Sequence, residues 1–253
     1  MQRQQIVGYL DGFLNIAAFA DDVSNNGLQV EGKPEIRKIA FGVDACQLLF
    51  EYAAKWGADM VIVHHGLSWG AFPKRLTGIE AKRFGALFRK DINLYAAHLP
   101  LDAHGEVGNN AVLCDILNLK KRVPFCRYHG YDIGFGGELS NDMPLENVAG
   151  IFQQLYPEEE FTLLGSGNVR RIAVCSGGGG MDALDQAIDQ KYDLLVTGEL
   201  SHVMYYPALE SGVGVLALGH YASETTGINA LMKKMQKEFA NVEMRFFDLP
   251  TLL

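Results

Sequence analysis

Residues 59–70 read Asp-Met-Val-Ile-Val-His-His-Gly-Leu-Ser-Trp-Gly. The first half of this stretch, residues 60–63, is a short apolar run rich in β-branched residues, which is typical of a buried strand in an α/β sheet. His64 and His65 follow at the carboxyl end, where α/β sheets place their ligands. Because neighbouring strand residues point to opposite faces, one metal ion could take both imidazoles only if the strand has ended, whereas two close ions could take one each. The alternative is a pair of partly buried histidines bonded to the backbone.

The composition indicates an ordinary soluble protein. The chain has 253 residues, 48% hydrophobic and 21% charged, enough for one large domain or two small ones. A net charge of −8 argues against a nucleic-acid or anionic-membrane surface. The four cysteines show no C-x-x-C spacing, which disfavours a zinc knuckle and favours reduced thiols. Without a signal peptide or a membrane-length apolar run, we expect a cytoplasmic protein with no membrane partner.

Strands alternate with helices along most of the chain, and this order predicts parallel β-α-β crossovers. The segment at 21–32 is expected to be a polar, turn-rich loop, and 131–139 a strand or edge segment interrupted by glycine. The predicted strands are 37–43, 60–63, 93–97, 161–164, 171–175, 194–197, 213–218 and 242–247. The predicted helices are 6–20, 46–56, 79–89, 109–117, 144–155, 181–190, 204–210 and 226–239.

The two parts of the chain resemble each other, which indicates an internal duplication. Four pairs of segments correspond in the same order: 37–40 with 170–173, 59–63 with 193–197, 94–98 and Asp102 with 216–220 and Glu224, and 108–113 with 227–232. We therefore predict two related α/β halves, residues 1–125 and 126–253, packed about a pseudo-twofold axis with the site in the cleft between them.

In that cleft the carboxyl ends of the matching strands would bring polar side chains together. These are His64, His65, His98 and Asp102 from the first half, with Glu199, His202, His220 and Glu224 from the second. Imidazoles with carboxylates suit zinc, iron, manganese or nickel, whereas calcium prefers oxygen alone. A carboxylate from each half is also what a site with two divalent ions needs, because carboxylates bridge cations and offset their charge. Buried, hydrogen-bonded histidines are the alternative.

Several short motifs now point to a known family. They are Asn25-Asn26-Gly27-Leu28-Gln29-Val30, His64-His65-Gly66, Ala97-His98-Leu99-Pro100-Leu101-Asp102, Thr197-Gly198-Glu199 and His220-Tyr221-Ala222-Ser223-Glu224. Together they resemble the YbgI-type family, also called Ngg-interacting-factor-three-like, many of whose members carry the name GTP cyclohydrolase I type 2. The similarity spans nearly the whole chain. Many longer relatives have an extra domain between the halves, which this chain lacks.

The resemblance implies a duplicated α/β protein with a dinuclear metal site, assembled as a toroidal homohexamer. The family's ligand pattern falls on His64, His65, Asp102, His220 and Glu224. His98 lies outside the usual ligand set, so we expect it beside the ligands, where it orients one of them or shuttles protons. Glu199 is a second candidate for proton transfer.

Two further stretches have open interpretations. Gly177, Gly178, Gly179 and Gly180 stand between a strand and a helix, where backbone N–H groups can bind phosphate, but they fit a tight turn equally well. Trp69, Phe72, Lys74 and Arg75 follow the paired histidines as a loop that could cover the cleft and contact an anionic substrate, or as solvated surface. Ser176 and Cys175 lack the context of a covalent nucleophile.

Two functions follow from these predictions. The first is a metal-dependent hydrolase that acts on a nucleotide-like substrate, which the resemblance directs toward GTP. The second is a non-catalytic protein that handles metal or forms a ring-shaped scaffold. Both need the same ligands, so ligand spacing does not separate them.

Overall fold

The computed structural model describes residues 1–71 and 75–251, and the chain divides into two compact units. Unit 1 comprises Met1–Leu101 and Ile228–Leu249, and unit 2 comprises Asp102–Gly227 with Pro250–Leu253. Both units are mixed α/β structures, as predicted. Across the described part of the chain, none of the helices is long and apolar enough to cross a lipid bilayer.

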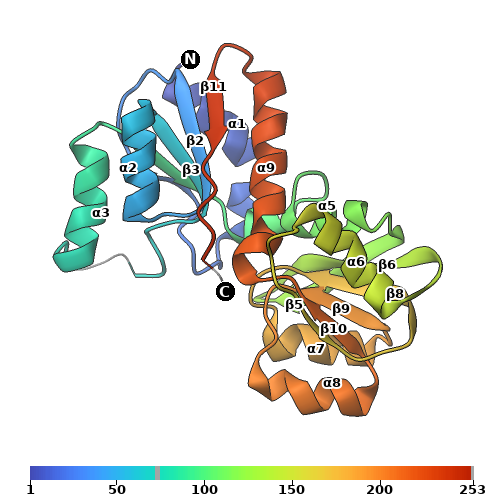
Figure 1. Ribbon diagram of the computed structural model, residues 1–253. Helices are drawn as coiled ribbons and strands as arrows, with labels where there is room; N and C mark the ends of the chain where they lie inside the picture. The colour runs from blue at the N-terminus through green and yellow to red at the C-terminus, as the bar shows by residue number, and fades with distance from the viewer. Residues whose placement is uncertain (72–74, 252–253) are drawn as a thin grey trace. The chain divides into compact units, whose positions relative to one another are not determined.

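Unit 1 is built on a sheet with the strand order β1-β4-β3-β2-β11. Four strands are parallel, and the edge strand β1 runs antiparallel to β4. Figure 1 shows α2 and α3 on one side of this sheet and α1 on the other. The strands are β1 (Gly27–Val30), β2 (Lys38–Asp44), β3 (Met60–His65), β4 (Asn93–Ala96) and β11 (Glu243–Phe246). The helices are α1 (Arg3–Phe13), η1 (Ile16–Phe19), α2 (Gln47–Trp56) and α3 (Gly78–Phe88), with most of α4 (Leu99–Asp102) and of α9 (His220–Glu238).

Unit 2 is built on a sheet with the strand order β5-β6-β8-β9-β10-β7. The strands β8, β9 and β10 are parallel, and the others pair antiparallel. Figure 1 shows α5 and α6 on one side of this sheet and α7 and α8 on the other. The strands are β5 (Lys120–Tyr128), β6 (Tyr131–Pro144), β7 (Thr162–Leu164), β8 (Asn168–Cys175), β9 (Leu194–Thr197) and β10 (Gly214–Ala217). The helices are α5 (Asn109–Ile116), α6 (Leu145–Leu155), α7 (Gly180–Asp189), η2 (His202–Met204) and α8 (Tyr205–Ser211).

The two sheets repeat one arrangement. The order β1-β4-β3-β2 in unit 1 and the order β7-β10-β9-β8 in unit 2 each place an antiparallel strand beside three parallel ones. A polar contact is repeated as well: Oδ2 of Asp59 accepts the backbone N–H groups of Arg37 (2.9 Å) and Lys38 (3.2 Å). In unit 2, Oδ2 of Asp193 accepts those of Arg170 (2.8 Å) and Arg171 (2.7 Å). The repeated topology therefore agrees with the internal duplication that the sequence predicts.

The compact units are divided at other positions than the predicted halves, because residues 228–249 complete the first sheet. The halves 1–125 and 126–253 and the pseudo-twofold axis stay predictions. The predicted helix 6–20 is instead α1, which ends at Phe13, followed by the short helix η1, because Asn15 between them has a left-handed backbone with φ +51°. The segment 21–32, predicted as a loop, contains β1, which forms by pairing antiparallel with β4. The charged strand β5 was not predicted, because it gains its structure from pairing with β6 at the sheet edge. Helix α9 begins at His220, earlier than the predicted residue 226.

Candidate functional site

Unit 1 gathers three histidines at the carboxyl ends of β3 and β4. His64 is fully buried, and His65 is the last residue of β3. His98 lies between β4 and α4. One ring nitrogen from each of the three lies within 4.8 Å of the others, which is close enough to hold a metal ion. The rings of His64 and His65 approach to 4.5 Å because the strand ends there, which is the condition under which adjacent histidines can face one site.

Each of these imidazoles donates its Nδ1 hydrogen to an oxygen atom. Nδ1 of His64 lies 2.9 Å from the carbonyl oxygen of Ala97, which can only accept. Nδ1 of His65 lies 2.8 Å from Oδ1 of Asp44, and Nδ1 of His98 lies 3.0 Å from Oδ1 of Asp22. An imidazole that is neutral with its hydrogen on Nδ1 presents the lone pair of Nε2, the arrangement that carboxylates and carbonyls favour in metal-binding histidines. The donor set of unit 1 therefore fits a transition-metal ion such as zinc.

Asp22 is the centre of the contacts that hold His98. Its carboxylate is fully buried and accepts hydrogen bonds from the side chain of Asn26 and the backbone N–H groups of Ser24 and Leu99. Burial works to raise the pKa of Asp22, but the hydrogen bond and charge of His98, together with the hydrogen bonds from Asn26 and Ser24, outweigh it and hold the pKa below its usual value. Since Leu99 is the first residue of α4, Asp22 fixes both the His98 ring and the start of that helix.

The loop after His65 is fixed by a residue from β1. Oε1 of Gln29 accepts the backbone N–H groups of Leu67 (2.7 Å) and Ser68 (3.1 Å). Gly66 has no room for a side chain, because a Cβ there would lie 2.4 Å from the Gln29 amide. Trp69 donates to the carbonyl of Gly66, and its ring lies 5.0 Å from that of His98. The paired histidines are thus followed by a held loop that places an indole ring beside them.

Unit 2 places His220 between two carboxylates. As the first residue of α9, His220 has Nδ1 2.5 Å from Oε1 of Glu199 and Nε2 3.2 Å from Oε1 of Glu224. The hydrogen bond to Glu224 is the main reason that the pKa of His220 is raised to about 9; burial opposes it, and Glu199 adds to it. The ring is therefore an imidazolium at neutral pH, and a metal ion could use Nε2 only after displacing its proton.

Asp102 is the other carboxylate of unit 2 that the sequence singled out. It is buried, and its Oδ1 accepts from Nδ2 of Asn109 (2.8 Å) and Oγ of Ser176 (3.3 Å). Carboxylate oxygens of Asp102 and Glu224 lie within 4.8 Å of each other. Two buried carboxylates at this separation repel each other unless positive charge lies near them. His220 supplies one such charge beside Glu224, and a divalent ion could take its place.

The glycine run has a structural role at this point. Gly177 has φ +62°, and a Cβ on it would lie 2.3 Å from Oε1 of Glu224 and 3.2 Å from Nε2 of His220. Its carbonyl accepts the N–H groups of Gly198 and Glu199, and its own N–H donates to Oγ of Ser223. These contacts agree with the tight-turn interpretation, and phosphate binding by the run stays a prediction.

Several predicted residues lie elsewhere or outside the described part of the chain. His202 is exposed on η2, and Arg75 is exposed. Phe72 and Lys74 lie outside the described residues. The sequence analysis did not identify Asp22 and Asp44 as partners of the histidines. The only signal in the sequence is an acidic residue in a polar loop for Asp22 and at a strand end for Asp44.

The chain matches known proteins over almost its whole length. Residues 1–251 match the model of the family described as Duf34/NIF3 (NGG1p interacting factor 3). A protein of Pyrococcus horikoshii named "GTP cyclohydrolase 1 type 2 homolog" is 48% identical, with 99% of each chain covered. One of the same name from Archaeoglobus fulgidus is 42% identical, with 100% of each covered.

Two solved structures show the same fold. The protein ybgI, described as of unknown function, has a TM-score of 0.90 and 35% identity, with 100% of both chains covered. TTHA1606 from Thermus thermophilus has a TM-score of 0.88 and 39% identity over the same coverage. The family resemblance carried by the sequence motifs is confirmed, and this chain belongs to the Duf34/NIF3 (NGG1p interacting factor 3) family.

Proposed function

We propose that the protein binds two divalent metal ions through His64, His65, Asp102, His220 and Glu224 and hydrolyses a nucleotide-like substrate. The observation that carries the proposal is the hydrogen bonding of the histidines in unit 1, where each Nδ1 donates to an oxygen and Nε2 is left as the donor atom for a metal. The buried carboxylates of unit 2 add the negative charge that divalent ions require.

A divalent ion held by these groups would lower the pKa of a bound water and polarise a carbonyl or phosphoryl oxygen. The side chains of the protein would carry out the proton transfers. His98 is oriented by Asp22 so that its Nε2 can accept a proton, and Glu199 is positioned through its hydrogen bond to His220. Both residues are proposed to carry the proton toward the leaving group, as the sequence analysis expected.

The nucleotide-like substrate is supported by the names of the relatives. Proteins 46% and 48% identical to this chain are named "GTP cyclohydrolase 1 type 2 homolog". A turnover assay with the metal-loaded protein on GTP and simple phosphoesters tests the hydrolase. No turnover above that of the free metal, combined with retained metal binding, would favour the metal-handling alternative.

Metal content tests the ligand set directly. Elemental analysis of His64→Ala and of Glu224→Ala should show a large loss of bound metal, whereas the exposed His129→Ala serves as a matched histidine variant and should keep it. If His64 and Glu224 hold the same ions, the His64→Ala/Glu224→Ala double variant should lose little more bound metal than either single variant. Equal metal content in wild type and the His65→Ala/His220→Ala variant would contradict the proposal.

The family resemblance also supports assembly into a closed ring of six chains. Closed symmetry is the usual state of homo-oligomers, and a ring would cover an open sheet edge such as β5. Light scattering should then give a mass several times the 27.9 kDa of one chain. A mass of one chain over a wide concentration range would exclude the ring.

A further inference from the structure

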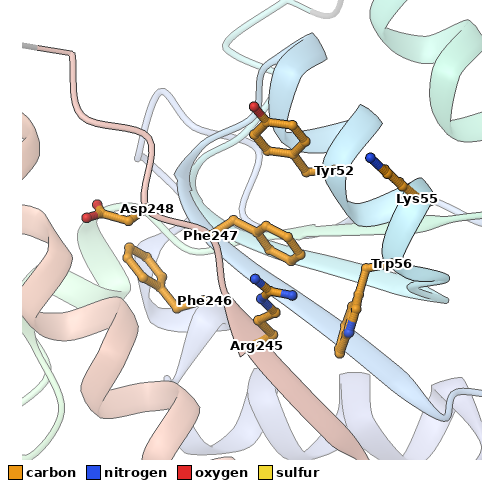
Figure 2. A pocket seen from close by; sticks show the side chains of 7 residues that line it. All are labelled: Tyr52, Lys55, Trp56, Arg245, Phe246, Phe247 and Asp248. Carbon is orange, nitrogen blue, oxygen red and sulfur yellow. The ribbon is translucent and has the colours of Figure 1, made fainter.

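Unit 1 has an open hollow on the sheet face that α2 only partly covers. It lies between α2 and the edge strand β11 with the residues after it, and its volume is about 560 Å³. Figure 2 shows the side chains that line it. Those used in the argument are Tyr52, Lys55, Trp56, Arg245, Phe247 and Asp248. None of them belongs to the proposed metal ligands.

Four aromatic residues line this hollow: Tyr52, Trp56, Phe246 and Phe247. The ring of Phe247 lies centrally, 6.4 Å from the ring of Tyr52 and nearly parallel to it, and 5.9 Å from that of Trp56 at 70°. Tyr52 is 43% exposed, and Trp56 and Phe247 are half-buried. Rings that remain open to solvent at a concave surface offer their faces to another planar group, because stacking removes apolar area from water.

Two cations lie in the lining of the hollow, and a third, Lys38, has its Nζ 4.9 Å from the ring centre of Trp56 and pairs with Glu243. The guanidinium of Arg245 stands 4.9 Å from the ring centre of Phe247, and Lys55 projects from the same face of α2 as Tyr52 and Trp56. Neither Lys55 nor Arg245 forms an ion pair with any residue that the structure describes. Asp248 contributes one negative charge to the lining, so the hollow is net positive on a chain of net charge −8.

We propose that this hollow binds a planar aromatic ring that carries an anionic group, of the size of a mononucleotide. The ring would stack on the aromatic walls, and the anion would bind Arg245 and Lys55, since a guanidinium both stacks and donates to phosphate. The volume falls within the range of small-ligand pockets. Two cations are too few for a nucleic-acid backbone on so acidic a chain.

The other side of α2 provides an internal comparison. A second hollow of about 390 Å³ lies between α2 and α3 and includes Lys82, Arg89 and Lys90 in its lining. Its one aromatic residue, Phe50, is 1% exposed and offers no ring face. The cations of either hollow would therefore attract an anion. Selectivity for an aromatic anion requires the open ring faces, which only the hollow between α2 and β11 offers of the two.

Titration calorimetry on the full chain tests the proposal, with guanosine 5′-monophosphate as the probe and EDTA present so that metal ions cannot contribute. The nucleotide should bind at least about tenfold more tightly than ribose 5-phosphate or guanosine, since each lacks one half of the recognised chemistry. Arg245→Gln and Trp56→Leu should each weaken binding by about tenfold or more. Lys90→Gln, in the second hollow, should bind as wild type does.

Three outcomes would overturn this proposal: no heat with the nucleotide at millimolar concentration, equal affinity for ribose 5-phosphate, or wild-type affinity in both Arg245→Gln and Trp56→Leu. Thermal melts of the variants check that each is folded. Because metal is absent from the assay, a failure here leaves the proposed hydrolase untouched, and a failure of metal binding leaves this hollow untouched.

Discussion

The repeated strands of the two units carry different side chains at their carboxyl ends, whereas the contacts at their amino ends are the same. Strand β3 continues into His64 and His65, and the register of the equivalent strand β9 places Gly198 and Glu199 at those two positions. The N-terminal contacts of the same strands, made by Asp59 and Asp193, are the same in both units. A duplicated scaffold has kept the contacts that set strand register and changed the side chains at the ends where ligands bind.

The repeated His-x-x-x-acid motif does not occupy equivalent places in the two sheets. Ala96 pairs with Val63 in unit 1, and Ala217 pairs with the equivalent Thr197 in unit 2. His98 therefore follows its last paired residue by two positions, and His220 follows by three (98 − 96 = 2; 220 − 217 = 3). As a result His98 precedes helix α4, whereas His220 is the first residue of α9. Sequence similarity between motifs thus does not guarantee the same geometry.

The largest difference between the units should appear when the shared carboxylate contact is removed. Asp59 is buried and also binds Nζ of Lys33 at 2.9 Å, whereas Asp193 is only half-buried. Asp59→Ala should lower the free energy of unfolding by about 3 kcal/mol, and Asp193→Ala by about half of that. Urea denaturation measures both. Equal losses would show that burial does not distinguish the two contacts.

The stability that Asp59 contributes should also depend on pH. Burial alone would raise the pKa of Asp59, but the hydrogen bonds from Lys33, Arg37 and Lys38 hold it below its usual value of 3.8. A carboxylate with a lowered folded-state pKa contributes stability above its unfolded pKa and loses it as the pH falls through the folded value. The stability difference between wild type and Asp59→Ala should therefore shrink below about pH 4.

A smaller effect should separate the two carboxylate–histidine pairs. The carboxylate of Asp22 is fully buried, whereas the side chain of Glu199 is 51% exposed. Asp22→Asn should cost about 2 kcal/mol, because an amide NH₂ would face N–H donors in a buried site. Glu199→Gln should cost less than about 1 kcal/mol. Nitrogen NMR of the histidine rings would also show His98 losing its preference for hydrogen on Nδ1, and an unchanged His98 spectrum in Asp22→Asn would contradict the positioning role.

A further effect, on ligand binding and not on folding, is a pH dependence of metal binding that comes from unit 2. His220 has a pKa raised to about 9, so below that pH a metal ion must displace a proton from it. Apparent zinc affinity should rise by up to about tenfold per pH unit between pH 7 and 9. Calorimetry in buffers of different ionisation enthalpy measures the released proton. Binding heats that do not depend on the buffer would rule out His220 as a ligand.

The sequence predicted the elements around the site because apolar strands and amphipathic helices carry periodic signals. It also predicted which histidines cluster in unit 1, because His64, His65 and His98 all follow such strands. It could not predict Asp22, which binds His98 from a loop 76 residues away in the chain, since an isolated acid has no pattern. Chemistry at strand ends was enough to propose candidate site residues, whereas the residues that orient the histidines required the fold.

The order of elements along the chain has a consequence for synthesis. Unit 2 is nearly continuous, from Asp102 to Gly227, whereas the sheet of unit 1 is completed by β11, which follows every strand of unit 2 in the described chain. During translation the second unit can close before the first has its final strand. A nascent or truncated chain that ends before β11 would present β2 as an open parallel edge, which is a template for pairing with other chains. Premature termination in this protein should therefore produce aggregation even though most of the sequence has been translated.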